Sequence, residues 1–327
     1  MEWSDRIGRR IRLRDLHILL TVVQQGSMGR AAKQLAVSQP VVSKVIADLE
    51  HVLAVRLLDR DRHGAEPTIY GEALLKHGVV VFDELRQSVK SIEFLTDPTV
   101  GDLRIGCINA MAAGLLPAVI SLLHRRYPRL TFHIVQANSV ATLYRDLRER
   151  NVDLVLGRNA TPSVEDDLNV DPLFSDPVLV VAGRRNRWIG RRKIELADLI
   201  HELWLLPPTG TAGEAISAQT FRACGLEIPC RGVVCTSIQM HNALLASGPY
   251  LAMRPAFMVR FGDNHPSIKV LPVKLPVVPE PVGIITLKAR TISPVARLFI
   301  DCVREVTKPL AGRPGGRTAN GRRPNVS

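Results

Sequence analysis

Residues 26–53 read GSMGRAAKQLAVSQPVVSKVIADLEHVL, and this stretch carries the signals of two helices joined by a tight turn. Ser27 is a good N-cap for a short helix, and Ser38 is a good N-cap for the longer helix that follows. Pro40 is tolerated in the first turn of that longer helix. The apolar residues that we expect to face inward are Ala31, Ala32, Leu35, Val42, Ile46, Leu49 and Leu53. The stretch therefore predicts a helix-turn-helix.

The chain on either side extends this unit. Upstream, a helix that ends at Gly26 is expected to bury four apolar residues at helical spacing, namely Leu16, Leu19, Leu20 and Val23. Downstream, residues 57–60 and 67–69 flank the polar, glycine-containing stretch 61–65, which favours a small β-wing. Thr68 is then expected to cap a long helix.

The exposed start of the longer helix predicts DNA binding, because it is slim enough for the major groove and carries small polar side chains. Gln39 can read adenine through two hydrogen bonds, and Lys44 can reach guanine or phosphate. The candidate DNA-binding residues are Ser27, Ser38, Gln39, Pro40, Ser43, Lys44, Arg60 and Arg62. The alternative is an ordinary three-helix packing unit with a polar outer face.

The long helix has apolar positions in steps of three and four, at Leu75, Gly78, Phe82, Leu85, Val89 and Ile92. Such an apolar seam with charged flanks is typical of a helix that packs against a partner helix, and a second copy of the chain would supply that partner. We therefore expect a homo-oligomer whose dimerisation residues are Phe82, Leu85, Val89 and Ile92. The alternative is packing of this helix on the second domain of the same chain.

Residues 14–95 resemble the DNA-binding region of LysR-type transcriptional regulators. The matching positions include Gly26-Ser27, Ala31-Ala32, Leu35, Val37-Ser38-Gln39-Pro40, Val42-Ser43, Ile46, Leu49-Glu50, Leu53, Arg56-Leu57-Leu58, Arg60, Thr68 and Gly71. The chain departs from the family pattern at Met28, Lys44 and Ala54, where Phe, Arg and Gly are usual, and in its basic extension over 1–13. The resemblance implies a sequence-specific regulator of transcription that binds double-stranded DNA and in which effector-domain contacts join two dimers into a tetramer.

Downstream of residue 98, short β-like runs alternate with helical ones, which indicates an α/β domain. The pattern restarts near Pro172, so we expect two lobes, and their order resembles the LysR-type effector domain, which is similar in fold to periplasmic binding proteins. The predicted fold class is α/β with an N-terminal all-α winged helix-turn-helix. Its predicted parts are a winged helix-turn-helix (14–71), a linker helix (72–97), and an effector domain (98–306) with lobe one at 102–170 and 268–306 and lobe two at 171–267.

A small-molecule effector, either a sugar or an organic acid, is expected between the lobes, where loops follow strands and precede helices. The candidate contacts are Asn109, Ala110, Met111, Ser139, Arg158, Thr209, Gly210, Thr211 and Ser237. Free N–H groups at helix starts suit carboxylate or hydroxyl oxygens, and Arg158 could pair with an acid. For each residue singly, an ordinary N-cap or a solvated arginine is an equally good reading.

Composition narrows the function classes. With 46% hydrophobic and 23% charged residues the 327-residue chain is not disordered throughout, although the Gly-, Pro- and Arg-rich tail over 307–327 is expected to be. A net charge of +12 favours a polyanionic partner. The N-terminus lacks an apolar signal segment, so a cytoplasmic protein is expected. The uncharged stretch 105–123 suits strand, turn and buried helix better than a membrane span.

Catalysis is not expected, because the phosphate-loop, nucleophile-elbow and zinc-protease motifs are absent and no histidine pair has ligand spacing. No cofactor or metal is predicted. Two other functions stay open: a thiol redox sensor that uses Cys224 and Cys230, with Cys107 at the cleft, and an architectural DNA binder without an effector.

Overall fold

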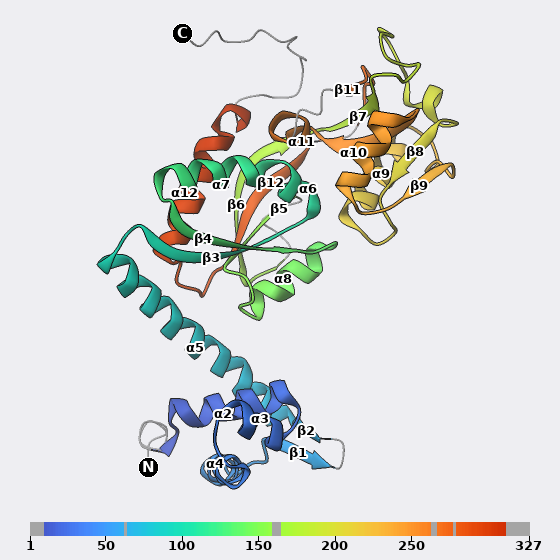
Figure 1. The fold of residues 1–327 in the computed structure, drawn as a ribbon. Coiled ribbons are helices and arrows are strands. Elements are labelled where there is room, and N and C mark those ends of the chain that lie inside the picture. Colours follow the sequence, from blue (N-terminus) through green and yellow to red (C-terminus); the bar gives the residue numbers. More distant parts are fainter. Residues whose placement is uncertain (1–9, 62–63, 159–164, 263–266, 277–278, 312–327) are drawn as a thin grey trace. The chain divides into compact units, whose positions relative to one another are not determined.

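The computed structural model describes residues 10–61, 64–158, 165–262, 267–276 and 279–311 (Figure 1). They fall into two compact units, one ending at Ser88 and one beginning at Val89. The first unit contains the helix-turn-helix, and the second contains two five-stranded sheets with the helices that cover them.

The first unit is a winged helix-turn-helix, as predicted. Its elements are α2 (Leu13–Gln25), α3 (Met28–Gln34), α4 (Gln39–Leu53), β1 (Leu58–Asp61), β2 (Gly64–Pro67) and the first part of α5 (Ile69–Thr96). Gly26 ends α2 in the left-handed conformation, with φ of 63°. Ser27 caps α3 by accepting a hydrogen bond from the backbone N–H of Arg30 at 3.2 Å. The N-cap expected of Ser38 is wrong in one respect: Ser38 occupies the position, but its side chain makes no capping hydrogen bond.

The buried face of α2 differs from the predicted one. Leu19 is buried as expected, but Leu16, Leu20 and Val23 are only half-buried, and the other fully buried apolar residues are Ile18 and Val22. The reason is that α2 packs on two sides. One side meets α3 and α4, while His17 contacts the ring of Phe82 in α5 with 5.8 Å between ring centroids. Two overlapping apolar stripes cannot be separated by periodicity alone.

The wing and the start of α5 are held by side-chain hydrogen bonds. β1 and β2 pair antiparallel, and the Glu50 carboxylate accepts the backbone N–H groups of Leu57 and Leu58. Thr68 caps α5 by accepting the N–H of Gly71 at 3.1 Å. A Cβ at Gly71 would lie 2.1 Å from the carbonyl oxygen of Leu57, so a larger residue would push the wing from the helix.

The first lobe of the second unit is built on a sheet of order β4-β3-β5-β12-β6. Its strands are β3 (Val100–Cys107), β4 (Arg129–Gln136), β5 (Leu154–Arg158), β6 (Leu168–Asp176) and β12 (Glu280–Leu287), and its helices are α6 (Asn109–Ala113), α7 (Leu115–Arg126), α8 (Val140–Arg148), α11 (Ala256–Phe261) and α12 (Pro294–Ala311). β3 runs parallel to β4 and β5, as the alternating pattern predicted, while β12 is antiparallel to its neighbours. Helices α7 and α12 cover one face of the sheet and α8 covers the other (Figure 1).

The second lobe is built on a sheet of order β11-β7-β10-β8-β9. Its elements are β7 (Val178–Gly183), η1 (Leu196–Leu199), β8 (Leu203–Leu206), α9 (Ala212–Ala223), β9 (Gly232–Val234), α10 (Ile238–Ser247), β10 (Tyr250–Pro255) and β11 (Ile268–Val270). Trp204 is fully buried in its core, where the indole N–H donates to the Leu199 carbonyl and the ring meets Phe221 edge to face. This aromatic pair anchors the sheet to η1 and α9.

The lobe boundaries differ from the predicted ones in three places. β6 belongs to the first sheet up to Asp176, because Pro172 lies at a bulge in an edge strand, where proline costs no ladder hydrogen bond. β11 pairs with β7 and so lies in the second lobe. α11 packs in the first lobe through Phe257 and Met258. In addition, α12 continues to Ala311, so residues 307–311 are helical and not disordered, while residues 312–327 lie outside the described part.

A buried ion cluster ties the end of α5 to the first lobe. The Lys90 ammonium lies 2.9 Å from the Asp102 carboxylate and 3.7 Å from that of Asp153. Asp153 in turn pairs with the buried Arg290 guanidinium at 2.7 Å, and Arg290 also donates to the Val152 carbonyl. Because a buried charge that loses its partner is costly, this cluster fixes the last turns of α5 to the sheet.

The uncharged stretch from Ile105 to Leu123 is divided among β3, α6 and α7. Within the described ranges, no helix is long and apolar enough to cross a membrane.

Candidate functional site

The outward surface of the helix-turn-helix is formed by the start of α4. Gln39, Pro40 and Lys44 are exposed there, as predicted, and Ser38 is exposed just before them. Ser43 is half-buried, because its hydroxyl donates to the Met28 sulfur at 3.3 Å. The hydroxyl of Ser27 is engaged in capping α3.

The two arginines expected in the wing cannot be placed. Arg60 lies in β1, but its side chain is outside the described part, and Arg62 lies outside it altogether. The exposed polar tip of α4 is therefore the part of the predicted DNA-binding surface that the structure places.

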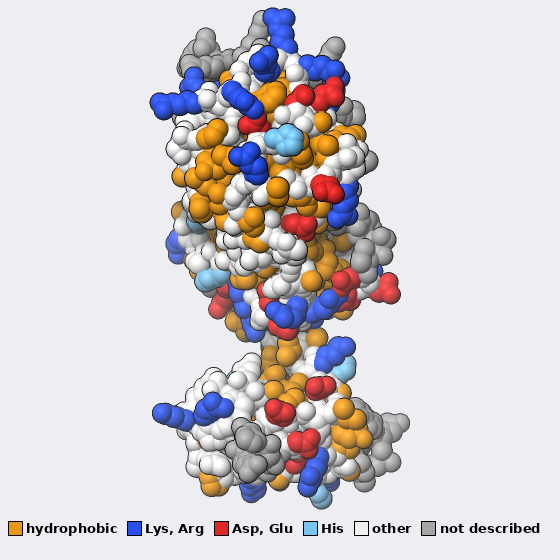
Figure 2. Space-filling model, turned by 90° about the vertical axis from the view of Figure 1, so that its right-hand side faces the viewer, with side chains coloured by type: hydrophobic (Ala, Val, Ile, Leu, Met, Phe, Trp, Pro, Cys, Tyr) orange, Lys and Arg blue, Asp and Glu red, His pale blue; other side chains and the backbone are white. Residues whose placement is uncertain are grey.

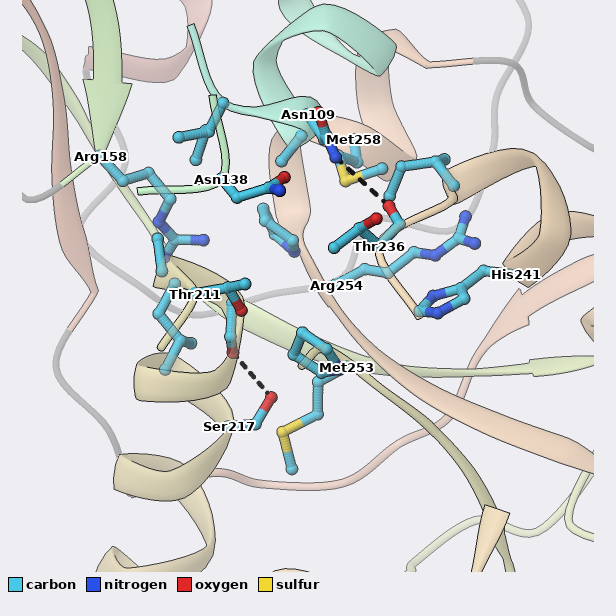
Figure 3. Close-up of a pocket in the computed structure, with 18 of the residues that line it drawn as sticks. Asn109, Asn138, Arg158, Thr211, Ser217, Thr236, His241, Met253, Arg254 and Met258 are labelled. Carbon is cyan, nitrogen blue, oxygen red and sulfur yellow. Dashed lines mark hydrogen bonds between the residues drawn. The ribbon is translucent and has the colours of Figure 1, made fainter. Parts of the chain in front are cut away.

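A cavity of about 130 Å³ lies between the two lobes of the second unit (Figure 3). Its polar lining comes from both lobes, with Asn109, Asn138 and Arg158 on the first and Thr211, Ser217, Thr236, His241 and Arg254 on the second. The carboxyl ends of β3 and β5 open onto it, at the point where neighbouring parallel connections diverge. The cavity thus occupies the place where open α/β sheets bind ligands.

Arg254 is the unusual cation of this cavity. It is 8% exposed and its guanidinium donates to the Asn242 amide oxygen at 2.6 Å, a neutral partner. Its Nε has no hydrogen-bond partner, and no carboxylate of the described residues lies within 4.0 Å of it. Burial lowers the pKa of Arg254 to about 10, so the side chain remains charged at neutral pH. A buried positive charge without a counterion is a strong attractor for an anion.

Arg158 has the opposite environment. It is 3% exposed, and its guanidinium lies 3.3 Å from the carboxylates of both Asp176 and Glu280. It also donates to the Asp176 carbonyl at 2.8 Å. Burial raises the pKa of Asp176 to about 6, although the nearby positive charge of Arg158 acts to lower it. Arg158 lines the cavity as predicted, but its charge is already compensated, so it is poorly suited to pairing with an acidic effector.

His241 lies beside Arg254 on the cavity wall (Figure 3). It is 8% exposed, and its Nε2 has no hydrogen-bond partner. Burial, together with the nearby Arg254 charge, lowers the pKa of His241 to about 4. The ring is therefore neutral at physiological pH and offers one free nitrogen to a ligand.

Two hydrogen bonds join the lobes across the cavity. The Asn109 amide donates to the Thr236 carbonyl at 3.3 Å, and the backbone N–H of Ala212 donates to the Asn138 carbonyl at 3.5 Å. Both are long, so they offer little resistance to opening.

The structure brings together four of the nine predicted effector contacts: Asn109, Ala110, Arg158 and Thr211 line the cavity. Met111 does not, because it is fully buried in the core of the first lobe. The hydroxyls of Ser139 and Ser237 accept backbone hydrogen bonds that cap α8 and α10. Ser237 and Thr209 line separate hollows, and Gly210 lines none of these.

The residues that sequence reasoning missed are the ones with the most distinctive chemistry, His241 and Arg254. Arg254 lies at the carboxyl end of β10, so the rule that ligands bind beyond strand ends could have found it. No sequence signal marks His241, which lies in the first turns of α10.

The cysteines considered for a thiol redox sensor are all free in the structure. Cys107 lies in the core instead of at the cleft, and burial raises its pKa to about 12, which disfavours the reactive thiolate. Cys224 is half-buried and Cys230 is exposed. Among the described residues, no group of three or more His, Cys, Asp or Glu side chains could hold a metal ion.

The lowered pKa of His241 predicts a pH-dependent stability. As the pH falls below 6.5, the unfolded chain takes up a proton at this position and the folded chain does not until about pH 4, so the folded state loses stability in that window. Between pH 7 and 5 the loss is about 2 kcal/mol of unfolding free energy. His241→Gln should remove it, as measured by urea unfolding at the two pH values. His201→Gln, at an exposed histidine of the same lobe, is the control; identical pH profiles for all three proteins would contradict the assignment.

Comparison with known proteins identifies the two units. The family described as the bacterial regulatory helix-turn-helix protein, lysR family, matches residues 13–72, and the LysR substrate binding domain matches residues 96–308. The uncharacterized HTH-type transcriptional regulator YdcI of Escherichia coli (strain K12) is 30% identical over 305 residues, which are 93% of this chain and 99% of that protein.

Solved structures agree with this. A full-length OxyR variant from Pseudomonas aeruginosa is 25% identical and superposes with a TM-score of 0.65, covering 93% of this chain and 99% of that one. CbnR, a LysR family transcriptional regulator, shares the fold at 20% identity with a TM-score of 0.59, over 91% of this chain and 99% of its own. The chain therefore belongs to the LysR family of DNA-binding transcriptional regulators and carries the LysR substrate binding domain of that family.

Proposed function

We propose that this regulator responds to a small organic acid whose carboxylate binds Arg254 in the cavity between the lobes. The observation that carries the proposal is the buried Arg254 guanidinium with a neutral partner and a free Nε. A carboxylate supplies the missing charge and accepts a charge-assisted hydrogen bond. A neutral sugar would leave the buried charge uncompensated, which favours the acid among the two effector classes expected from the sequence.

The remaining lining defines the rest of the ligand. His241 offers a neutral ring nitrogen, and Thr211 and Thr236 come from the same lobe as Arg254. Met253 and Met258 supply flexible apolar surface. A short acid with one further polar group, such as a hydroxyl or keto oxygen beside the carboxylate, fits a cavity of about 130 Å³.

The proposal includes DNA reading by α4 and self-association through α5, in a cytoplasmic protein. Leu85, Val89 and Ile92 on α5 are 44%, 52% and 64% exposed, which supports their pairing with a second copy of the chain. Phe82 is a weaker candidate, because it is half-buried against His17. Pairing would place two helix-turn-helix units on one operator, as a two-half-site sequence requires.

The effector proposal is tested by thermal shift of the full-length protein with short carboxylic acids, their uncharged amides and sugars. Acids alone should raise the melting temperature. For any acid that binds, Arg254→Met should weaken affinity by about 2 kcal/mol, roughly thirtyfold, because a charge-assisted hydrogen bond is lost. Arg260→Met, which removes an exposed arginine six residues on, is the matched control and should bind as the wild type does. Equal affinity in Arg254→Met would place the carboxylate elsewhere, and a response to sugars alone would overturn the proposed effector class.

The DNA-reading proposal is tested at Gln39. Gln39→Ala should cost about 1–3 kcal/mol at the preferred sequence and relax the preference at one base pair of each half-site, because a bidentate contact to a base edge is lost. The preference is measured by selection from a random duplex library at fixed salt, for the wild type and the variant in parallel. Ala47→Ser, at an exposed position about two turns further along α4 than Gln39, is the control for a change of surface side chain. An unchanged base preference in Gln39→Ala would show that this end of α4 does not face the bases.

A further inference from the structure

A dense group of positive charges lies in the second lobe, away from the cavity lining. Residues 184–193 read RRNRWIGRRK, with six cations and no acid in ten residues. These six charges equal half of the chain's net charge of +12. The stretch forms the loop between β7 and η1, and Figure 2 shows Lys and Arg side chains gathered at the upper end of this face of the second unit. We call residues 184–193 the arginine loop.

All six charged side chains are exposed, and four of them have no counterion among the described residues. Arg187 pairs with Glu202, and Lys193 lies 3.0 Å from Glu195. Around the other four, namely Arg184, Arg185, Arg191 and Arg192, no carboxylate of the described residues lies within 4.0 Å. Mutual repulsion among unpaired cations so close in sequence is unfavourable for folding, so a partner that relieves it gains binding free energy.

The backbone that displays these arginines is fixed. Asn186 is 4% exposed; its side chain donates to the Pro249 carbonyl at 2.9 Å and accepts the N–H of Trp188 at 3.0 Å. The N–H of Arg184 donates to the Ser267 carbonyl at 2.6 Å. Trp188 and Ile189 pack against the hydrophobic core of the second lobe. A preorganised loop loses less conformational entropy when it binds a partner than a mobile loop does.

Two neighbouring lysines widen the positive surface. Lys269 is exposed on β11, which pairs with β7 directly before the loop, and Lys274 is exposed beside the bridge between Ile194 and Val273. The surface also carries acids at its edge, Glu195, Asp198 and Glu202. Two of these three are used by the pairs already named, so the loop itself stays strongly positive.

We propose that the arginine loop binds the phosphate backbone of double-stranded DNA. Guanidinium forks match phosphate oxygens, and five of the six cations are arginines. A membrane surface is less suitable, because the apolar residues of the loop, Trp188 and Ile189, pack into the core and leave nothing to insert. The carboxylates of an acidic protein segment would match guanidinium forks as well, so what favours DNA is that this protein already binds it. Duplex DNA is also the polyanion already held by the family's helix-turn-helix, so flanking phosphates are present at high effective concentration.

The test compares two full-length triple variants. Arg184→Gln/Arg191→Gln/Arg192→Gln removes three unpaired charges of the loop. Arg125→Gln/Arg222→Gln/Arg297→Gln removes three exposed arginines elsewhere in the second unit, none with an ion pair in the described part, and so matches the change in net charge. The affinity of each protein for a random-sequence duplex is measured by fluorescence anisotropy across a range of salt concentrations.

In the loop variant, the slope of log affinity against log salt should fall by about 2.7, because each lost phosphate contact removes about 0.9. The control variant should keep the wild-type slope. A charge-preserving Arg184→Lys/Arg191→Lys/Arg192→Lys variant should restore most of the slope, which separates charge from misfolding.

Two results would overturn the proposal. One is a wild-type slope in the loop variant, which together with lost binding to anionic vesicles or polyglutamate would point to a membrane or an acidic protein instead. The other is an equal slope loss in the loop and control variants. Selection from a random duplex library should give the same base preference for the loop variant as for the wild type. The outcome is therefore independent of the effector proposal and of base reading by Gln39.

Discussion

The two lobes are joined at a buried ion pair between Arg158 and Asp176. Asp176 ends β6, and its carboxylate also accepts the backbone N–H groups of Ala256 and Phe257, where the chain returns from the second lobe. Glu280, which lies 3.3 Å from Arg158, begins β12 where the chain returns to the first lobe for the last time. The Arg158 guanidinium thus lies at three of the four places where the chain changes lobes. Without the Arg158 guanidinium, two neighbouring carboxylates would lose their counterion, which would destabilise the junction beside the cavity.

The two buried arginines of the cavity, Arg158 and Arg254, differ in whether a carboxylate compensates their charge. Arg158 and Arg254 both line the cavity and both are more than nine-tenths buried, yet the guanidinium of Arg158 has two carboxylates and that of Arg254 has an amide. A buried guanidinium with only a neutral partner is unfavourable, and an anion would relieve this cost. Under the proposed function, the cost of burying Arg254 would thus appear as affinity for the effector, while Arg158 would keep its structural role. The two long hydrogen bonds that cross the cavity, from Asn109 and from Ala212, can break and re-form as the lobes move.

Local signals made the N-terminal unit predictable, whereas tertiary contacts decide the effector cavity. The cap at Ser27, the turn before α4 and the inward face of Val42, Ile46 and Leu49 depend on neighbours within a few residues, and the structure confirms them. The sequence pattern restarts near Pro172, which predicts a lobe boundary there. The first sheet continues past it, because β6 is an edge strand in which proline removes no ladder hydrogen bond. That edge position depends on pairing with a strand more than a hundred residues later. Arg254 and His241 escaped detection because their burial comes from packing between distant segments, which no spacing rule reports. Helix starts such as Ser139 drew attention because capping residues and ligand-binding residues look alike in sequence.

The central claim is that an anion bound at Arg254 changes how the protein holds DNA. The most direct measurement is the operator affinity of the full-length protein with and without a saturating carboxylate effector, together with the effector affinity with and without operator. Because coupling free energy is reciprocal, both affinities should change by the same factor in the wild type. In Arg254→Met, at effector concentrations only a few times the wild-type dissociation constant, operator affinity should stay close to its unliganded value. An operator affinity that is the same with and without saturating effector in the wild type would contradict the account.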